Sequence, residues 1–189
     1  MSTHIDTEEI TSQPEACAEL SFPDLVQRLM EQTSPPELKD LNSWLAAADI
    51  STEDVQPYIA FKEGNYWRHR VCRNQVVEML VLCWRPGHRT PIHDHNGSHG
   101  VVRVHGGILT ESIYKYDETE GLSYVSGREC RAGEVTGAGV PDIHRLENAE
   151  NSGEDLITIH VYAPPLGVLK TYKVGSPQID LYTPDETAV

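Results

Sequence analysis

The histidines of this chain include a closely spaced pair, His93 and His95, and a third residue, His144, much later in the sequence. Side chains along a strand point alternately to opposite faces, so an extended segment here would place His93 and His95 on one face. An imidazole from a distant strand could then complete a triangle of nitrogen ligands. Three protein ligands leave coordination positions open, which is typical of a catalytic metal site. We therefore predict a metal site at His93, His95 and His144.

The residues around these histidines resemble the two motifs of the cupin superfamily, a small β-barrel that often holds one metal ion. Glycines stand before His93 and after the next expected strand, and the second stretch, residues 133–148, contains His144. The resemblance implies a mainly β fold, namely an antiparallel barrel of the jelly-roll or double-stranded β-helix type. Asp94 and His99 are either partners that orient the ligands or solvated loop residues.

The first motif departs from the usual cupin pattern, which places a Glu ligand shortly after the second histidine. His99 and Gly100 occupy the positions where that carboxylate is expected. Three neutral imidazoles leave the full charge of a divalent ion to be balanced by exogenous ligands, and a substrate thiolate would balance part of it. Thiolate suits Fe(II), so iron is favoured. Zinc with three histidines and a water is the rival that the residues leave open.

A second group of polar residues alternates with apolar ones between Leu156 and Tyr162. Thr158, His160 and Tyr162 would share one face of a strand, with the apolar residues on the other. A half-exposed strand gives the same alternation. A hydrogen-bonded relay that ends in a phenol beside a metal would instead hold bound oxygen or move a proton.

A third element is the segment from Tyr66 to Arg70. In an extended conformation Tyr66, Arg68 and Arg70 share one face. An arginine that points inward near a metal would bind a substrate carboxylate through two parallel hydrogen bonds. The alternative is a solvated edge strand.

Composition narrows the class of protein. The 189 residues carry a formal net charge of −14, which argues against nucleic acid and anionic membranes as partners. We find neither a membrane-spanning apolar run nor a secretory signal, and a reducing cytoplasm fits best. We expect a monomer or small homo-oligomer. The cysteines lack CxxC spacing and are expected to be free thiols: Cys17, Cys72, Cys83 and Cys130.

The chain divides into four predicted segments. They are a flexible acidic start, two short helices packed on the barrel, the barrel itself, and a loose tail that contains Pro177 and Pro184. Ser21 is expected to cap the first helix. The segments comprise residues 1–20, 21–56, 57–175 and 176–189. Short strands with glycine-rich turns between them indicate a sandwich or barrel. They are expected at residues 76–84, 100–105, 108–116, 122–130, 156–162 and 169–174.

Taken together, these features resemble the cysteine dioxygenase family of thiol dioxygenases, over roughly residues 58–172. The likeness is carried by Tyr66-Trp-Arg68 and by the segments Gly87–His99, Asp142–Asn148 and Thr158–Pro165. The resemblance implies Fe(II) at the three histidines and a small thiol and dioxygen as substrates. Both oxygen atoms would go to the sulfur of L-cysteine, giving cysteine sulfinic acid.

The same resemblance implies the roles of the surrounding residues. Arg68 would hold the substrate carboxylate with Tyr66 nearby, and His160 would link Thr158 to Tyr162. The Ala163-Pro164 bond would be cis. Animal members carry a cysteine that crosslinks to the tyrosine, but here that position is Gly100, so Tyr162 would be a free phenol.

Other functions stay open at this point. The same chemistry on 3-mercaptopropionate or mercaptosuccinate is one, and Arg70 would suit the second carboxylate of mercaptosuccinate. A zinc or manganese cupin that acts as a lyase or isomerase is another. The third is a non-enzymatic metal-binding cupin, which would not need Arg68 and Tyr162 beside the metal.

Overall fold

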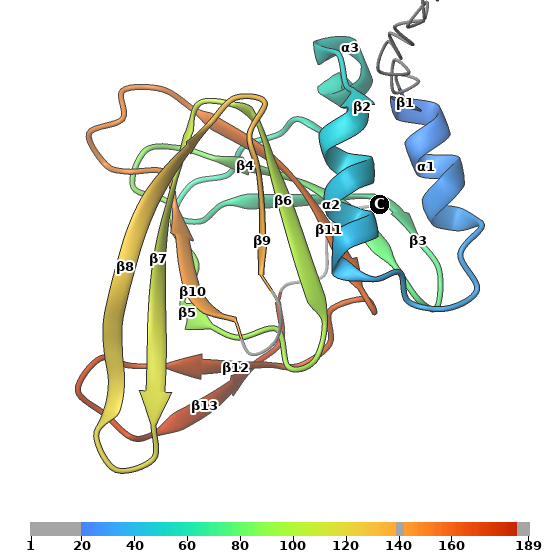
Figure 1. Cartoon of the computed structure of the whole chain (residues 1–189). Coiled ribbons are helices and arrows are strands. Elements are labelled where there is room, and N and C mark those ends of the chain that lie inside the picture. Colours follow the sequence, from blue (N-terminus) through green and yellow to red (C-terminus); the bar gives the residue numbers. More distant parts are fainter. Residues whose placement is uncertain (1–19, 139–141, 185–189) are drawn as a thin grey trace, which may run out of the picture.

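The computed structural model describes residues 20–138 and 142–184. Two antiparallel sheets face each other and enclose the interior of a barrel (Figure 1). The predicted flexible N-terminal segment lies, up to residue 19, outside the described residues. The five-stranded sheet runs in the order β3 (Trp67–Arg73), β4 (Glu78–Trp84), β11 (Leu156–Ala163), β6 (His99–Gly106) and β9 (Val135–Ala138). The six-stranded sheet runs β13 (Ile179–Tyr182), β12 (Leu169–Tyr172), β5 (Ile92–His93), β10 (Ile143–Glu147), β7 (Ile108–Asp117) and β8 (Gly121–Arg131).

Strand β4, an inner strand of the five-stranded sheet, shows how this sheet contributes to the core. All of its residues are buried, because one face packs inside the barrel and the other packs under the helices. Leu80, Leu82 and Trp84 belong to the interior cluster. Met79, Val81 and Cys83 belong to the cluster under the helices. A strand that is covered on both faces is a continuous apolar run, as this segment is.

The helices lie against the outer face of the five-stranded sheet (Figure 1). They are α1 (Phe22–Met30), α2 (Leu38–Ala47), α3 (Thr52–Val55) and the 3-10 turn η1 (Gln56–Tyr58). Two short parallel strands, β1 (Leu20–Ser21) and β2 (Ala48–Asp49), join them. Ser21 caps α1 as expected, since its Oγ accepts a hydrogen bond from the Asp24 N–H at 3.3 Å. Among the described residues, no helix is long and apolar enough to cross a membrane.

The C-terminal segment differs from the expected loose tail. Ile179–Tyr182 form β13, which pairs with β12 at the edge of the six-stranded sheet. Pro177 and Pro184 bracket this short strand, and prolines so close together obscure a strand signal in the sequence. Leu181 is exposed, whereas Tyr182 on the opposite face lines a pocket.

Candidate metal centre

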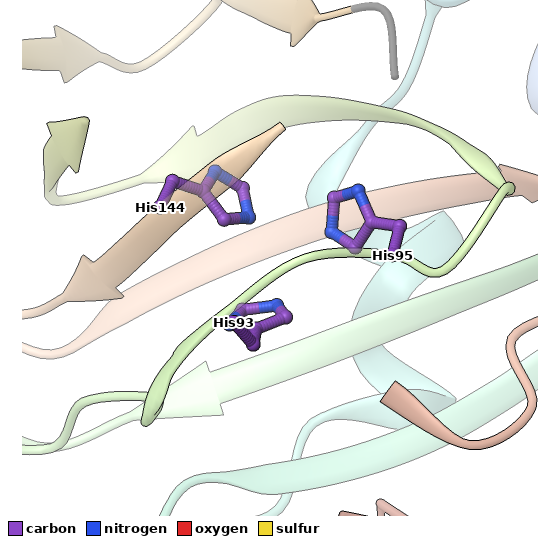
Figure 2. Close-up of side chains that lie close together, drawn as sticks. All are labelled: His93, His95 and His144. Carbon is purple, nitrogen blue, oxygen red and sulfur yellow. The ribbon is translucent and has the colours of Figure 1, made fainter. Parts of the chain in front are cut away.

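The three predicted histidines converge inside the barrel. His93 ends β5 and pairs directly with His144 on β10, and His95 follows in the loop after β5. One nitrogen from each ring lies within 4.8 Å of the others, and all three residues are buried (Figure 2). The strand ends earlier than expected, so the loop, and not strand alternation, brings His95 to the same side as His93.

Hydrogen bonds orient two of these rings. His93 Nδ1 lies 3.0 Å from the Pro91 carbonyl, and His144 Nδ1 lies 2.8 Å from Glu111 Oε1. Both partners accept hydrogen bonds, so each Nδ1 carries the proton and each Nε2 keeps its lone pair. His144 Nε2 and both nitrogens of His95 are buried without a hydrogen-bond partner among the described residues. Buried polar atoms are normally paired, so these orphaned nitrogens fit a metal ion.

The surroundings keep the imidazoles of His93 and His95 neutral. Burial, and then the neighbouring His144, lower the pKa of His93 to about 3. The same two causes hold the pKa of His95 well below its ordinary value. Because a metal binds only the unprotonated nitrogen, the ligands are ready to bind a cation at neutral pH.

Glu111 on β7 orients His144, and the sequence analysis missed it. Its other oxygen, Oε2, accepts from Arg128 Nε at 2.6 Å and from Thr136 Oγ1 at 3.3 Å. Burial alone would raise the pKa of Glu111, but the hydrogen bonds and charges of His144 and Arg128 lower it to about 2. The one available signal was its position on the strand face that also buries Leu109. A carboxylate behind a ligating histidine fixes its tautomer and raises its basicity.

Asp94 secures the segment between His93 and His95. Its carboxylate accepts from the N–H of Asn96 at 3.1 Å, the N–H of Lys170 at 3.2 Å and the hydroxyl of Tyr172 at 2.9 Å. Asp94 is therefore a buried structural group and not a solvated loop residue.

A chain of hydrogen bonds runs along β11 beside the metal site. His160 Nδ1 lies 2.9 Å from the Tyr162 hydroxyl, and His160 Nε2 lies 2.8 Å from Thr158 Oγ1. Trp84 Nε1, absent from the sequence prediction, donates to Thr158 Oγ1 at 2.9 Å. All four side chains are buried, so the alternative of a half-exposed strand is wrong.

A narrow pocket lined by residues of both sheets reaches His93, one of the three histidines. Arg68, Tyr66 and Tyr162 line it together with His93. Arg70 is not among the described residues that line it. The remaining lining residues are Leu82, Thr90, Pro91, Leu146, His160, Leu166, Leu169, Tyr182 and Pro184. The pocket thus places a guanidinium and three phenols in the same space as His93.

Burial governs the chemistry of two phenols in this pocket, Tyr66 and Tyr162. It raises the pKa of Tyr66 to about 12 and that of Tyr162 further still. Tyr66 stacks on Trp84 with ring centroids 4.3 Å apart. Both phenols are therefore protonated at neutral pH and act as hydrogen-bond donors, not as bases.

Gly100 on β6 packs so closely against the site that an added side chain would contact His95 and Tyr162. A Cβ here would lie 2.9 Å from His95 Cε1 and 3.0 Å from Tyr162 Cε1. We expect Gly100→Ala to displace His95 and lower metal affinity about 10- to 100-fold, as loss of support for a ligand does. Metal titration of the purified protein measures this.

The matched control is Gly106→Ala on the same strand, where a Cβ meets no atom within 4 Å. This control should bind metal as the parent does. Unchanged metal affinity in Gly100→Ala would show that His95 does not need its present position.

Comparisons with known proteins agree with this geometry. The model of the family described as cysteine dioxygenase type I matches residues 10–174. Cysteine dioxygenase type 1 of Homo sapiens is 29% identical over 161 residues, which cover 72% of this chain and 80% of the human protein. The Rattus norvegicus protein of the same name is 26% identical over 155 residues, which cover 72% and 77%.

One solved structure supports the fold alone. A Klebsiella pneumoniae protein with a double-stranded β-helix domain aligns with a TM-score of 0.50 at 20% identity. The alignment covers 68% of this chain and 88% of that one. The predicted double-stranded β-helix barrel is therefore confirmed.

Proposed function

Because this chain belongs to the cysteine dioxygenase family, we propose that it is an iron-dependent dioxygenase that converts L-cysteine to cysteine sulfinic acid. The observation that carries the proposal is the pocket, in which Arg68 and the metal ligand His93 line the same narrow space. A short thiol with a carboxylate at its other end matches these two groups. The guanidinium would bind the carboxylate while the thiolate lies at the metal.

The charge of the site supports a thiolate substrate and Fe(II). The three ligands are neutral imidazoles, and no acidic side chain is among the described residues that line the pocket. A divalent ion here keeps its full charge for anionic ligands, and a thiolate is one that suits iron. When bound, Fe(II) would supply the redox chemistry that lets dioxygen react with a thiolate.

The relay sets the direction of the Tyr162 hydroxyl. Trp84 can only donate to Thr158, and His160 Nε2 is the other hydrogen-bond partner of the Thr158 hydroxyl among the described residues, so we infer that the hydroxyl proton goes to His160 Nε2. His160 then carries its proton on Nδ1 and donates to the Tyr162 oxygen. Burial holds the pKa of His160 well below its ordinary value, so the ring is neutral and carries one proton. The Tyr162 hydroxyl proton is thereby free to point at a bound substrate.

Tyr162→Phe tests this role without disturbing the metal ligands. We expect turnover to fall about 10- to 100-fold, the effect of a lost hydrogen bond to a charged group, with metal content unchanged. Steady-state kinetics with oxygen and sulfinate measured together would show it. A variant that matches the parent in both rate and coupling would make the phenol a bystander.

The position of Arg70 bears on the choice of thiol. Mercaptosuccinate carries two carboxylates, and the second would require another cation in the pocket. Arg68 lines the pocket and Arg70 does not, within the part of the chain that is described. This favours a thiol with one carboxylate, either L-cysteine or 3-mercaptopropionate.

Oxygen consumption by the iron-loaded protein tests the proposal. L-Cysteine, 3-mercaptopropionate and mercaptosuccinate are compared in parallel, with each sulfinate quantified and a zinc-loaded sample as control. Cysteine-dependent uptake matched by cysteine sulfinate supports the proposal. A preference for another thiol would keep the proposed chemistry and change the substrate assignment to that thiol. No uptake with any thiol despite bound iron would favour a zinc or manganese cupin enzyme or a non-enzymatic cupin.

The cysteines fit the proposed cytoplasmic location. Cys72, Cys83 and Cys130 are free thiols in the described residues, and Cys17 lies outside them. Burial raises the pKa of Cys72 to about 11 and also raises the pKa of Cys83 and Cys130, which makes all three poor nucleophiles. They act as packing residues and do not take part in the proposed reaction.

A further inference from the structure

The strand β13 brings a phenol to the substrate pocket from outside the part of the chain that matches the family. The match ends at residue 174, whereas Tyr182 lies on β13 directly opposite Leu169. Both residues line the pocket, together with Pro184. Leu181, the neighbour on the other face of the strand, is 73% exposed. Strand alternation therefore aims Tyr182 inward while Leu181 points to solvent.

Tyr182 lines this pocket together with Arg68 and Tyr66. Burial is the main cause that raises the pKa of Tyr66, and the charge of Arg68 and the nearby Tyr182 also act on it, so the three groups lie close together. Arg68 has only N–H groups to offer, and the phenol of Tyr182 carries one proton that it can donate. A carboxylate in this part of the pocket would therefore accept from both side chains.

From this arrangement we propose that Tyr182 is a substrate-binding residue that donates to the carboxylate held by Arg68 and so selects carboxylated thiols. The inference rests on the proposed function and adds a recognition element to it. A carboxylate has two oxygens that accept several hydrogen bonds, and the fork of one arginine uses only some of them. Leu169, the strand partner of Tyr182, lines the same pocket with Leu166 and Pro184, and these three side chains carry no hydrogen-bond donor.

Anaerobic calorimetry with the iron-loaded full chain tests the proposal by binding alone. The variant is Tyr182→Phe, and the ligands are L-cysteine and cysteamine, which has the same thiol and amine but no carboxylate. We expect the Kd for cysteine to rise about tenfold, because a hydrogen bond to a charged group is lost, and the Kd for cysteamine to stay the same. Leu181→Ala on the outer face of β13 is the matched control and should leave both constants unchanged.

The outcomes separate this inference from the proposed function. Equal losses for both thiols would mean that Tyr182 only packs the wall, and no change for either would remove it from recognition. Either result overturns the inference. The proposed function still stands in that case if the parent protein forms cysteine sulfinate. A parent that consumes no oxygen with any thiol would refute that function, and the cysteine-to-cysteamine comparison would still show whether Tyr182 contacts the carboxylate. A parent that binds neither thiol overturns both.

Discussion

Replacing His144 with alanine should empty the metal site and abolish activity. Supporting groups behind a ligand already contribute about 10- to 100-fold to metal affinity, so losing a ligand itself should cost more than about 100-fold. Only two of the three converging histidines, His93 and His95, would then remain to bind the ion. Metal analysis after dialysis, together with oxygen uptake, measures both consequences.

Two further variants make this result specific. Glu111→Gln keeps the shape of the group behind His144 but removes its charge, so metal affinity should fall by an intermediate amount. His105→Ala removes a half-buried histidine of β6 that is not part of the three-histidine cluster, and it should keep its metal. Full metal occupancy in His144→Ala would refute the ligand assignment.

The pair His93 and His95 and the relay were predictable because their chemistry is local, whereas His144 was predicted from its resemblance to the second cupin motif. His93 and His95 are close in sequence, and Thr158, His160 and Tyr162 follow the period of a single strand. The hydrogen bonds along β11 confirm that these three side chains share one face. A central strand that is buried on both faces imposes this alternation regardless of the rest of the fold.

Glu111, Trp84 and Tyr182 could not be predicted in the same way. Glu111 and Trp84 bond to partners on other strands, and Tyr182 lines a pocket built by several strands, so the role of each depends on strand order and register. Register in a barrel is decided by packing over the whole molecule, and a shift by one residue turns a side chain to the opposite face. β13 adds a second difficulty, since so short a strand between prolines has too little pattern to stand out from a tail.

Arg68→Ala should weaken the use of cysteine far more than the use of a thiol without a carboxylate. A charge-assisted hydrogen bond contributes about 1.5–3 kcal/mol, so kcat/KM for cysteine should fall about 10- to 100-fold, mostly through KM. Cysteamine lacks the carboxylate and should be affected little. Steady-state kinetics with both thiols at saturating oxygen give the comparison.

The neighbouring arginine provides the control for this prediction. Arg70 is on the same strand and the same predicted face as Arg68, but it does not line the pocket in the described part of the chain. Arg70→Ala removes the same charge from the protein, so it separates general electrostatic attraction of anions from direct binding. If both variants lose cysteine activity equally, long-range attraction explains the effect, and Arg68 is not the carboxylate ligand. A loss confined to the Arg68 variant requires a direct contact between Arg68 and the carboxylate. Arg68→Lys should then restore the activity only in part, because lysine keeps the charge but cannot form the planar pair of hydrogen bonds.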